Sequence, residues 1–346
     1  MDGRRVSGGT AGCRGPWPMT SNPVRILVFA EQRDGALMRS AHELFARAVQ
    51  WPLRCGIDVA AVTMGRGAER AAREATAAGA RQVWWLEEAG TISLPLRRLR
   101  AMTAVAREVG AGVVLFSDTD LGRDLAPRLA ARLGAAFLSN VQDVRSKGEQ
   151  VLLARPLFGG RFVEELELSG SCPLVLTWGG TGAALPVEPA AAGGEIRALG
   201  LAEDPFDLRV RVMTSEAAEG RDLAQAEVVV CGGRGIGGAD GFRLVCDLAD
   251  ALGGAPAASR AAVDAGYAPP GLQIGQSGKA VHPRLYVALG VSGSLQHRAG
   301  MRNSRCVIAV NSDPHAPIMQ WADYGIVGDW RIVGEALLAA ARRAGG

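Results

Sequence analysis

The stretch that decides the fold is Ala226–Gly238, with the sequence AEVVVCGGRGIGG. Its first six residues form a mostly apolar run of strand length. The glycines then turn the chain into a segment with helical spacing from Gly241 to about Leu252. Gly253 and Gly254 are placed to end that helix. A strand, a tight turn and a helix in this order are typical of a parallel α/β sheet. The stretch therefore predicts a Rossmann-like domain.

The first half of the chain repeats this alternation. Apolar runs of strand length alternate with segments of helical spacing, which is typical of a parallel sheet covered on both faces. The expected strands are Val24–Ala30, Ile57–Met64, Gln82–Leu86 and Gly112–Ser117, and the expected helices are Ala36–Trp51, Gly67–Ala78, Leu96–Val109 and Leu125–Leu133. Shorter, partly alternating runs then predict added strands with a hairpin, at Val151–Arg155, Arg161–Leu168 and Leu174–Trp178. Residues 179–200 are rich in glycine and proline and are expected to form a loop or linker.

The length of 346 residues suits about two domains at roughly 150 residues each. We predict an α/β protein of two domains, each a mainly parallel sheet covered by helices. The expected parts are a disordered tail at 1–23, a first domain at 24–200, a linker at 201–225 and a second domain at 226–346. Met19, just before the first strand, is a second candidate start of translation beside Met1.

Composition excludes several classes of protein. The net charge is only +3, from 38 basic and 35 acidic residues, so no strong attraction to nucleic acid is expected. No apolar run approaches the roughly 18 residues of a membrane span, and the first 23 residues lack the apolar stretch of a signal peptide. The six cysteines are scattered, without the spacing of a metal site. They indicate a reducing compartment, and we expect a cytoplasmic protein without a metal.

Glycine is the unusual component: it accounts for 46 of the 346 residues, about 13% against a typical 7%. Residues 233–238 formally match the dinucleotide motif G-x-G-x-x-G after a strand. The acidic residue expected about 20 positions later is replaced by Ser259 and Arg260. Two interpretations stay open here, an NAD-dependent oxidoreductase using Gly233, Gly235 and Gly238, or a tight turn only. The first strand of the first domain runs into no such loop, so that domain is expected to be a scaffold or partner surface.

Four further loops of the second half carry hydroxyl, amide or acidic side chains, and the first two of them combine hydroxyl and amide side chains with glycine. They are Gln273–Lys279, Ser292–His297, Asn311–Asp313 and Gly328–Trp330. Any one of them could be a merely structural turn. Because the last three follow expected strands, we expect the loops to meet at one edge of the sheet, where backbone N–H groups can bind an anion such as a pyrophosphate. No side chain here forms a nucleophile or an acid/base pair, so no catalytic residue is predicted.

At these residues the sequence resembles the alpha subunit of electron-transfer flavoprotein, a family of heterodimeric FAD carriers. The resemblance is close over about residues 226–340 and looser over 24–178. The matching runs are Gly232–Gly235, Ser259–Gly266, Gly275–Lys279, Ser292–His297, Asn311 and Ala322–Gly325, with Gly122–Arg128 in the first domain. The resemblance implies a DHS-like C-terminal domain that holds FAD in an extended pose, with the rest of the site supplied by a beta subunit.

The resemblance also implies roles for individual residues. Arg234 would face the pyrophosphate, and Arg260 would lie against the flavin ring and favour its anionic reduced form. His297 matches a histidine near flavin O2 with the same electrostatic purpose, and Ser277 keeps the hydroxyl of a threonine that meets flavin N5. The complete set of implied FAD-binding residues is Arg234, Ser259, Arg260, Ile274, Gly275, Gln276, Ser277, Ser292, Gly293, Ser294, Leu295, Gln296, His297, Asn311, Asp329 and Trp330.

The function implied by the resemblance is that of an electron carrier, which is not itself an enzyme. It would accept electrons from flavoprotein dehydrogenases of the acyl-CoA type, as in fatty acid β-oxidation, or of the N-methyl amine type. It would pass them to a membrane quinone reductase or the respiratory chain. Two alternatives within the family are a flavin-based bifurcating variant and an interaction protein that has lost its redox role.

Overall fold

The computed structural model describes residues 24–51, 56–88, 95–147, 150–158, 162–168, 172–179, 193–202, 204, 223 and 225–344. The expected tail and most of the expected linker lie outside these residues. The described chain forms two compact units, the first mainly of residues up to 213 and the second mainly of residues from 214 onward. Each is an α/β unit built on a parallel sheet, so the predicted fold class is confirmed.

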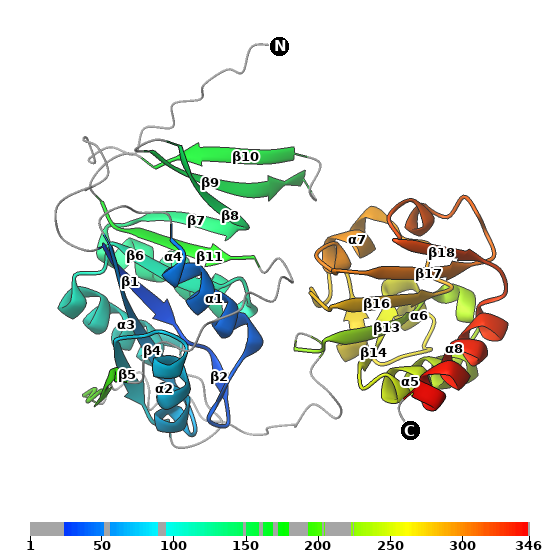
Figure 1. Ribbon diagram of the computed structural model, residues 1–346, viewed down its shortest axis with the longest axis horizontal. Coiled ribbons are helices and arrows are strands. Elements are labelled where there is room, and N and C mark those ends of the chain that lie inside the picture. Colours follow the sequence, from blue (N-terminus) through cyan, green and yellow to red (C-terminus); the bar gives the residue numbers. More distant parts are fainter. Residues whose placement is uncertain are drawn as a thin grey trace, which may run out of the picture. The chain divides into compact units, whose positions relative to one another are not determined.

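The first unit is built on a seven-stranded sheet in the order β12-β5-β4-β1-β6-β11-β7 (Figure 1). Its neighbouring strands all pair in parallel. The strands are β1 (Val24–Phe29), β4 (Ile57–Met64), β5 (Gln82–Leu86), β6 (Val113–Ser117), β7 (Ala136–Val141), β11 (Leu174–Trp178) and β12 (Glu195–Ala198). The helices are α1 (Arg39–Val49), α2 (Ala68–Ala77), α3 (Pro95–Val109) and α4 (Asp120–Leu133).

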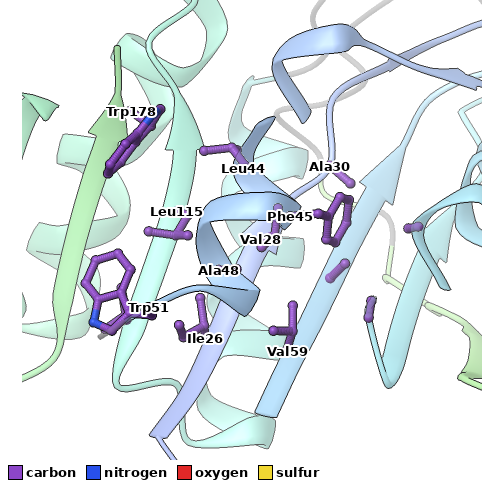
Figure 2. Packing of buried hydrophobic residues seen from close by; sticks show 14 of the residues in the cluster. Ile26, Val28, Ala30, Leu44, Phe45, Ala48, Trp51, Val59, Leu115 and Trp178 are labelled. Atoms are coloured by element: carbon purple, nitrogen blue, oxygen red, sulfur yellow. The ribbon is translucent and has the colours of Figure 1, made fainter. Parts of the chain in front are cut away.

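Both faces of this sheet are apolar, and each packs against two helices. Side chains of α1 and α2 share one core with alternate residues of β1, β4 and β6, and those of α3 and α4 share the core on the other face. Figure 2 shows the first of these cores, where Leu44 and Phe45 of α1 lie over Ile26, Val28 and neighbouring strand residues. Each such fully buried side chain contributes roughly 1.5–3 kcal/mol to stability.

Two smaller sheets extend the first unit. In the first sheet, a two-residue turn joins β2 (Gln32–Arg33) to β3 (Ala36–Leu37). The second sheet has the order β10-β9-β8. Its strands are β8 (Asp143–Lys147), β9 (Gln150–Leu157) and β10 (Phe162–Glu167). The predicted hairpin is therefore present in β9 and β10, whereas β11 belongs to the main sheet, between β6 and β7.

Two helix starts differ by three or more residues from the sequence prediction. Helix α1 begins at Arg39 instead of Ala36, because residues 36 and 37 pair with the preceding strand. Helix α4 begins at Asp120 instead of Leu125, because the Thr119 side chain accepts a hydrogen bond from Gly122 N at 3.1 Å and caps the helix five residues earlier.

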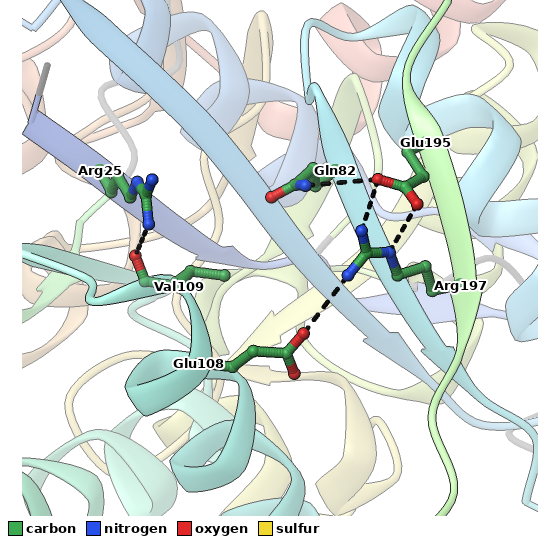
Figure 3. Close-up of polar contacts among 6 residues, drawn as sticks. All are labelled: Arg25, Gln82, Glu108, Val109, Glu195 and Arg197. Carbon is green, nitrogen blue, oxygen red and sulfur yellow. Dashed lines mark hydrogen bonds and ion pairs between the residues drawn. The ribbon is translucent and has the colours of Figure 1, made fainter.

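Strand β12 corrects the prediction that residues 179–200 form only a loop or linker. It pairs in parallel with β5 at the edge of the sheet, although all four of its side chains are exposed. Figure 3 shows Arg197 of this strand with its carboxylate partners Glu195, at 2.7 Å, and Glu108, at 3.4 Å. A short charged edge strand without an apolar face leaves no periodic signal in the sequence. Residues 180–192 of the predicted loop lie outside the described residues.

The second unit is built on a six-stranded parallel sheet in the order β15-β14-β13-β16-β17-β18. The strands are β13 (Val228–Gly232), β14 (Ala255–Ser259), β15 (Gln273–Ile274), β16 (Leu285–Leu289), β17 (Val307–Asn311) and β18 (Tyr324–Val327). Helices α5 (Ala239–Ala251) and α8 (Trp330–Ala344) share a core with one face of the sheet, and α7 (Leu295–Met301) lies on the other. A short helix α6 (Arg260–Asp264) follows β14.

Candidate functional site

The carboxyl edge of the second sheet collects the residues that the sequence analysis singled out. The chain builds the sheet outward from β13 through β14 to β15, then returns to place β16, β17 and β18 on the other side of β13. The order therefore reverses between β13 and β16, and open parallel sheets bind ligands outside their carboxyl ends at this kind of reversal. Because all neighbouring pairs are parallel, the loops after every strand lie at this one edge (Figure 1).

The glycines after β13 and β16 let two loops approach backbone to backbone. Gly233 N donates to Leu289 O at 2.8 Å, and Gly235 N donates to Gly290 O at 3.1 Å. A Cβ on Gly233 would lie 2.0 Å from Gly290 O, whereas a Cβ on Gly238 would meet nothing within 4 Å. In a dinucleotide fingerprint the third glycine provides close packing of the helix on the strand. Gly238 has no such contact, so the motif at 233–238 is explained by packing between loops.

The loop after β15 is fixed against the start of α7. Gln276 N donates to Gln296 O at 2.8 Å, and Gly275 has a φ of +141°, which favours glycine. The exposed Ser277 accepts a hydrogen bond from the Gln273 amide at 3.1 Å, which leaves its own hydroxyl hydrogen available. The backbone of this loop is thus rigidly held while the Ser277 hydroxyl faces solvent.

Two predicted serine ligands act as helix caps in this structure. Ser294 Oγ accepts from His297 N, and Ser259 Oγ accepts from Ala262 N, each at 3.3 Å. Gly293, with a φ of +80°, brings the chain against Ile318, where a Cβ would lie 2.6 Å from the Ile318 nitrogen. The half-buried Ser259 and the exposed Ser294 therefore shape the edge, and Ser292, Leu295 and Gln296 are exposed beside Ser294.

Two arginines place positive charge at this edge. Arg234 is exposed in the loop after β13. Arg260 follows β14, and its guanidinium is 3.4 Å from the Asp264 carboxylate, with both side chains about two-thirds exposed. A solvent-exposed ion pair of this kind contributes little to stability. The Arg260 guanidinium can therefore exchange this partner for an anionic ligand at low cost.

His297 differs from these exposed residues because its side chain is only 5% exposed. Its Nε2 lies 2.9 Å from the Tyr286 hydroxyl. Burial lowers the pKa of His297 to about 4, an effect that the Ile274 backbone carbonyl opposes. The imidazole of this chain is therefore neutral at neutral pH, and the electrostatic role toward a flavin that the resemblance implies stays a prediction. Sequence reasoning missed Tyr286, which lies inside an otherwise apolar strand.

The last predicted residues stabilise the far side of the edge. The Asn311 amide donates to Val291 O at 2.8 Å and accepts from Asp313 N at 2.9 Å. Asp329 accepts from Arg331 N at 2.7 Å and so caps α8. Trp330 is half-buried, with the Arg331 guanidinium 5.0 Å from its ring centroid. The side chains of Asn311 and Asp329 bind nearby backbone groups and thereby order the loops around the edge.

The donor set fits a long anionic cofactor with one apolar end. Exposed guanidiniums, a free serine hydroxyl, fixed loop backbone and an indole lie along one edge of one sheet. This combination matches the needs of a dinucleotide, whose pyrophosphate takes cations and N–H donors. In the described part of the chain, no group of three His, Cys, Asp or Glu side chains is arranged to hold a metal ion. Within the same residues, no helix combines the length and apolarity of a membrane span.

Comparison with known proteins gives matches along both units. Residues 26–204 match the model of the electron transfer flavoprotein domain, and residues 222–302 match that of the electron transfer flavoprotein FAD-binding domain. The electron transfer flavoprotein subunit alpha of Thermoanaerobacterium thermosaccharolyticum is 37% identical over 309 residues, covering 88% of this chain and 93% of that protein. The subunit alpha of Mycobacterium leprae is 39% identical over 307 residues, with the same coverage. The protein FixB of Clostridium saccharobutylicum is 35% identical over 325 residues, covering 92% of this chain and 96% of that protein.

Proposed function

Because the chain belongs to the electron-transfer flavoprotein alpha-subunit family and carries its FAD-binding domain, we propose that it is the FAD-holding half of a heterodimeric electron carrier. The observation that supports this most directly is the carboxyl edge of the second sheet, where Arg234, Arg260 and Ser277 are exposed around a rigid backbone. FAD, when bound, supplies the one-electron and two-electron chemistry. The beta subunit completes the site, and the first unit serves as scaffold and partner surface.

Each exposed side chain then has a distinct task toward the cofactor. The Arg234 guanidinium holds the pyrophosphate, and the Arg260 guanidinium lies at the flavin ring, where it stabilises the negative charge that reduction adds. The Ser277 hydroxyl donates a hydrogen bond to the ring. His297 contributes a neutral N–H, so Arg260 is the source of positive charge near the flavin. At the adenosine end of the cofactor lie Asn311, Asp329 and Trp330.

The electron donors are flavoprotein dehydrogenases of the acyl-CoA or N-methyl amine type, and the acceptor is a membrane quinone reductase. The protein works in the cytoplasm, where its cysteines stay reduced. Cys172, Cys231, Cys246 and Cys306 are free thiols in the described chain, which agrees with this location.

The proposal is tested by co-expression with a beta subunit of the family and measurement of flavin absorbance. We expect a yellow heterodimer with one FAD. A colourless heterodimer that cannot be reconstituted with FAD would refute the proposal. Two FAD per heterodimer would identify the bifurcating variant, and binding of NAD but not FAD, measured by calorimetry, would identify the oxidoreductase alternative.

Replacing Arg260 with alanine is expected to lower the two-electron midpoint potential of the bound FAD by about 30–60 mV. A hydrogen bond to a charged group contributes about 1.5–3 kcal/mol, and about 1.4 kcal/mol corresponds to 30 mV for a two-electron couple. Spectroelectrochemical titration measures the shift. The matched control is Arg284→Ala, because Arg284 forms a similarly exposed ion pair, with Glu227 at 3.7 Å, at the opposite edge of the sheet. Equal midpoint potentials in the wild type and the Arg260 variant would show that Arg260 does not stabilise the reduced flavin.

A further inference from the structure

A buried polar contact lies beneath the carboxyl edge of the second sheet. Tyr286 of β16 is fully buried, and its hydroxyl is 2.9 Å from Nε2 of His297 on α7. The two rings meet edge to face, with centroids 6.3 Å apart. The surrounding side chains, which include Cys231, Ala288 and Ile274, are apolar or weakly polar. In such surroundings an unpaired hydroxyl would cost about 1–3 kcal/mol, so the position of each proton matters.

All three polar groups of this cluster are uncharged at neutral pH. Burial raises the pKa of the Cys231 thiol to about 12 and that of the Tyr286 phenol well above its usual value. Burial lowers the pKa of His297 to about 4. The cluster therefore holds one S–H, one O–H and a single ring N–H, and the question is which imidazole nitrogen carries the proton.

Two arrangements of these protons are possible. If Nε2 carried the proton, it would donate to the phenol. Among the described residues, the phenol hydrogen would then have the Cys231 sulfur as its acceptor, and sulfur accepts weakly. Nδ1, which is buried and makes no hydrogen bond to a described residue, would then present a bare lone pair. The Ile274 carbonyl raises the pKa of His297 and so favours a proton on the ring. A bare lone pair on Nδ1 would offer this carbonyl no hydrogen-bond donor.

In the second arrangement the strongest donor of the cluster, the phenol O–H, has a strong acceptor. The phenol O–H donates to Nε2, a strong acceptor, and the Cys231 thiol lies 3.9 Å from Gly232 O, within reach of a weak S–H hydrogen bond. The imidazole proton is then on Nδ1, which makes no hydrogen bond to a described residue. Nδ1 is unpartnered in both arrangements, so the phenol decides between them: its proton has a strong acceptor, Nε2 at 2.9 Å, only in the second arrangement, which is therefore favoured.

We propose that Tyr286 is a positioning residue: its buried hydroxyl, 2.9 Å from Nε2, holds His297 as the neutral tautomer with its proton on Nδ1. The imidazole then has one N–H, on Nδ1. We infer that this N–H points away from Tyr286 and toward the loop that begins at Ile274. This inference rests on the proposed function for its consequence, because that loop carries Ser277 and lies where the flavin ring is placed. Tyr286 is fully buried, so we expect it to act only through His297.

The test is the ¹⁵N NMR spectrum of the full-length chain, labelled at histidine. The chain has four histidines, so the ring signals are few, and His297→Gln assigns its pair by their disappearance. We expect Nε2 of His297 in the unprotonated range and Nδ1 in the protonated range at pH 7. In Tyr286→Phe we expect the Nε2 signal to shift to the protonated range, because the phenyl ring offers no proton. The matched control Cys231→Ala removes the neighbouring thiol but keeps the phenol, and is expected to leave both signals in place.

A protonated Nε2 in the wild type would overturn the proposal, as would identical His297 signals in the wild type and Tyr286→Phe. If Tyr286→Phe does not fold, the Nε2 signal of the wild type and of Cys231→Ala still shows whether Nε2 carries the proton. The consequence for the flavin has a separate readout, the midpoint potential of the FAD-loaded heterodimer. If the tautomer changes and the midpoint potential does not, the His297 tautomer has no effect on the flavin. If the wild type fails to bind FAD, only the proposed function is refuted.

Discussion

Alanine at position 233 is expected to destabilise the second unit by about 3 kcal/mol and to abolish FAD retention. The backbone of Gly233 has a φ of −91°, which any residue adopts, so the cost arises from contacts alone. The added Cβ would lie 2.0 Å from Gly290 O and 2.5 Å from Val291 Cα, both backbone atoms that cannot rotate away. Forcing the loops apart stretches the hydrogen bond from Gly233 N to Leu289 O and overpacks the edge, which typically costs 1–3 kcal/mol or more.

Urea unfolding followed by circular dichroism measures the loss of stability, and flavin absorbance after gel filtration measures the loss of FAD. The control is Gly238→Ala in the same motif, where a Cβ would meet nothing within 4 Å. It is expected to retain FAD and to stay within about 0.5 kcal/mol of the wild type, as surface substitutions usually do. If both variants lost FAD to the same extent, the glycines would act on the cofactor directly and not through packing between loops.

The glycine motif illustrates where sequence reasoning succeeded and where it ended. The alternation of apolar runs and helical segments predicted both parallel sheets, because strands buried on two faces have a local signature. The motif at 233–238 also lies at the carboxyl edge of the second sheet, where the other predicted site residues gather. Its reason lay outside the local sequence: the partner of Gly233 is Gly290, whose close approach is visible only once the two strands lie side by side.

The difference between a local sequence signal and a contact made only by the fold also explains which candidate site residues were predicted and which was missed. Arg234, Arg260 and Ser277 stand in runs that match the family, so the sequence singled them out as candidates, and their roles toward FAD stay predictions. Tyr286 looks like an ordinary apolar residue of β16, and only the fold brings its hydroxyl to His297. The neutral state of His297 was equally hidden, because it depends on the depth of burial and not on the residue type.

Glu31→Gln is expected to stabilise the first unit by up to about 3 kcal/mol at pH 8 and to leave its stability unchanged at pH 4. Glu31 follows β1, and its side chain is only 6% exposed. Burial is the main reason why its pKa is raised from 4.5 to about 7, while the hydrogen bond from Thr119, at 2.6 Å, and the charge of Arg98 oppose the shift. Each pKa unit corresponds to about 1.36 kcal/mol, so a shift of this size represents about 3 kcal/mol.

The direction of the pH dependence follows from the two pKa values. Below pH 4.5 the carboxyl group is protonated in both the folded and the unfolded chain, so it has no effect on the free energy of unfolding. Between pH 4.5 and about 7 the unfolded chain ionises Glu31 while the folded chain keeps it protonated, so the wild type loses stability as the pH rises. Above about pH 7 the loss is complete. Glutamine resembles the protonated carboxyl group in shape and can still accept the Thr119 hydrogen bond, but it cannot ionise.

Urea unfolding of the wild type and the variant at pH 4, 5.5, 7 and 8 tests this prediction, because the difference in the free energy of unfolding should grow across the series and then level off. The control is Glu69→Gln, since Glu69 is half exposed and pairs with Arg73 on the surface of α2, where the loss of one charge changes stability by less than about 1 kcal/mol. A difference between the wild type and Glu31→Gln that is the same at every pH would mean that packing, and not ionisation of a buried carboxyl group, separates the two proteins. A difference that instead appears only below pH 4.5 would have the wrong sign for a raised pKa and would place Glu31 among the ion-paired carboxylates.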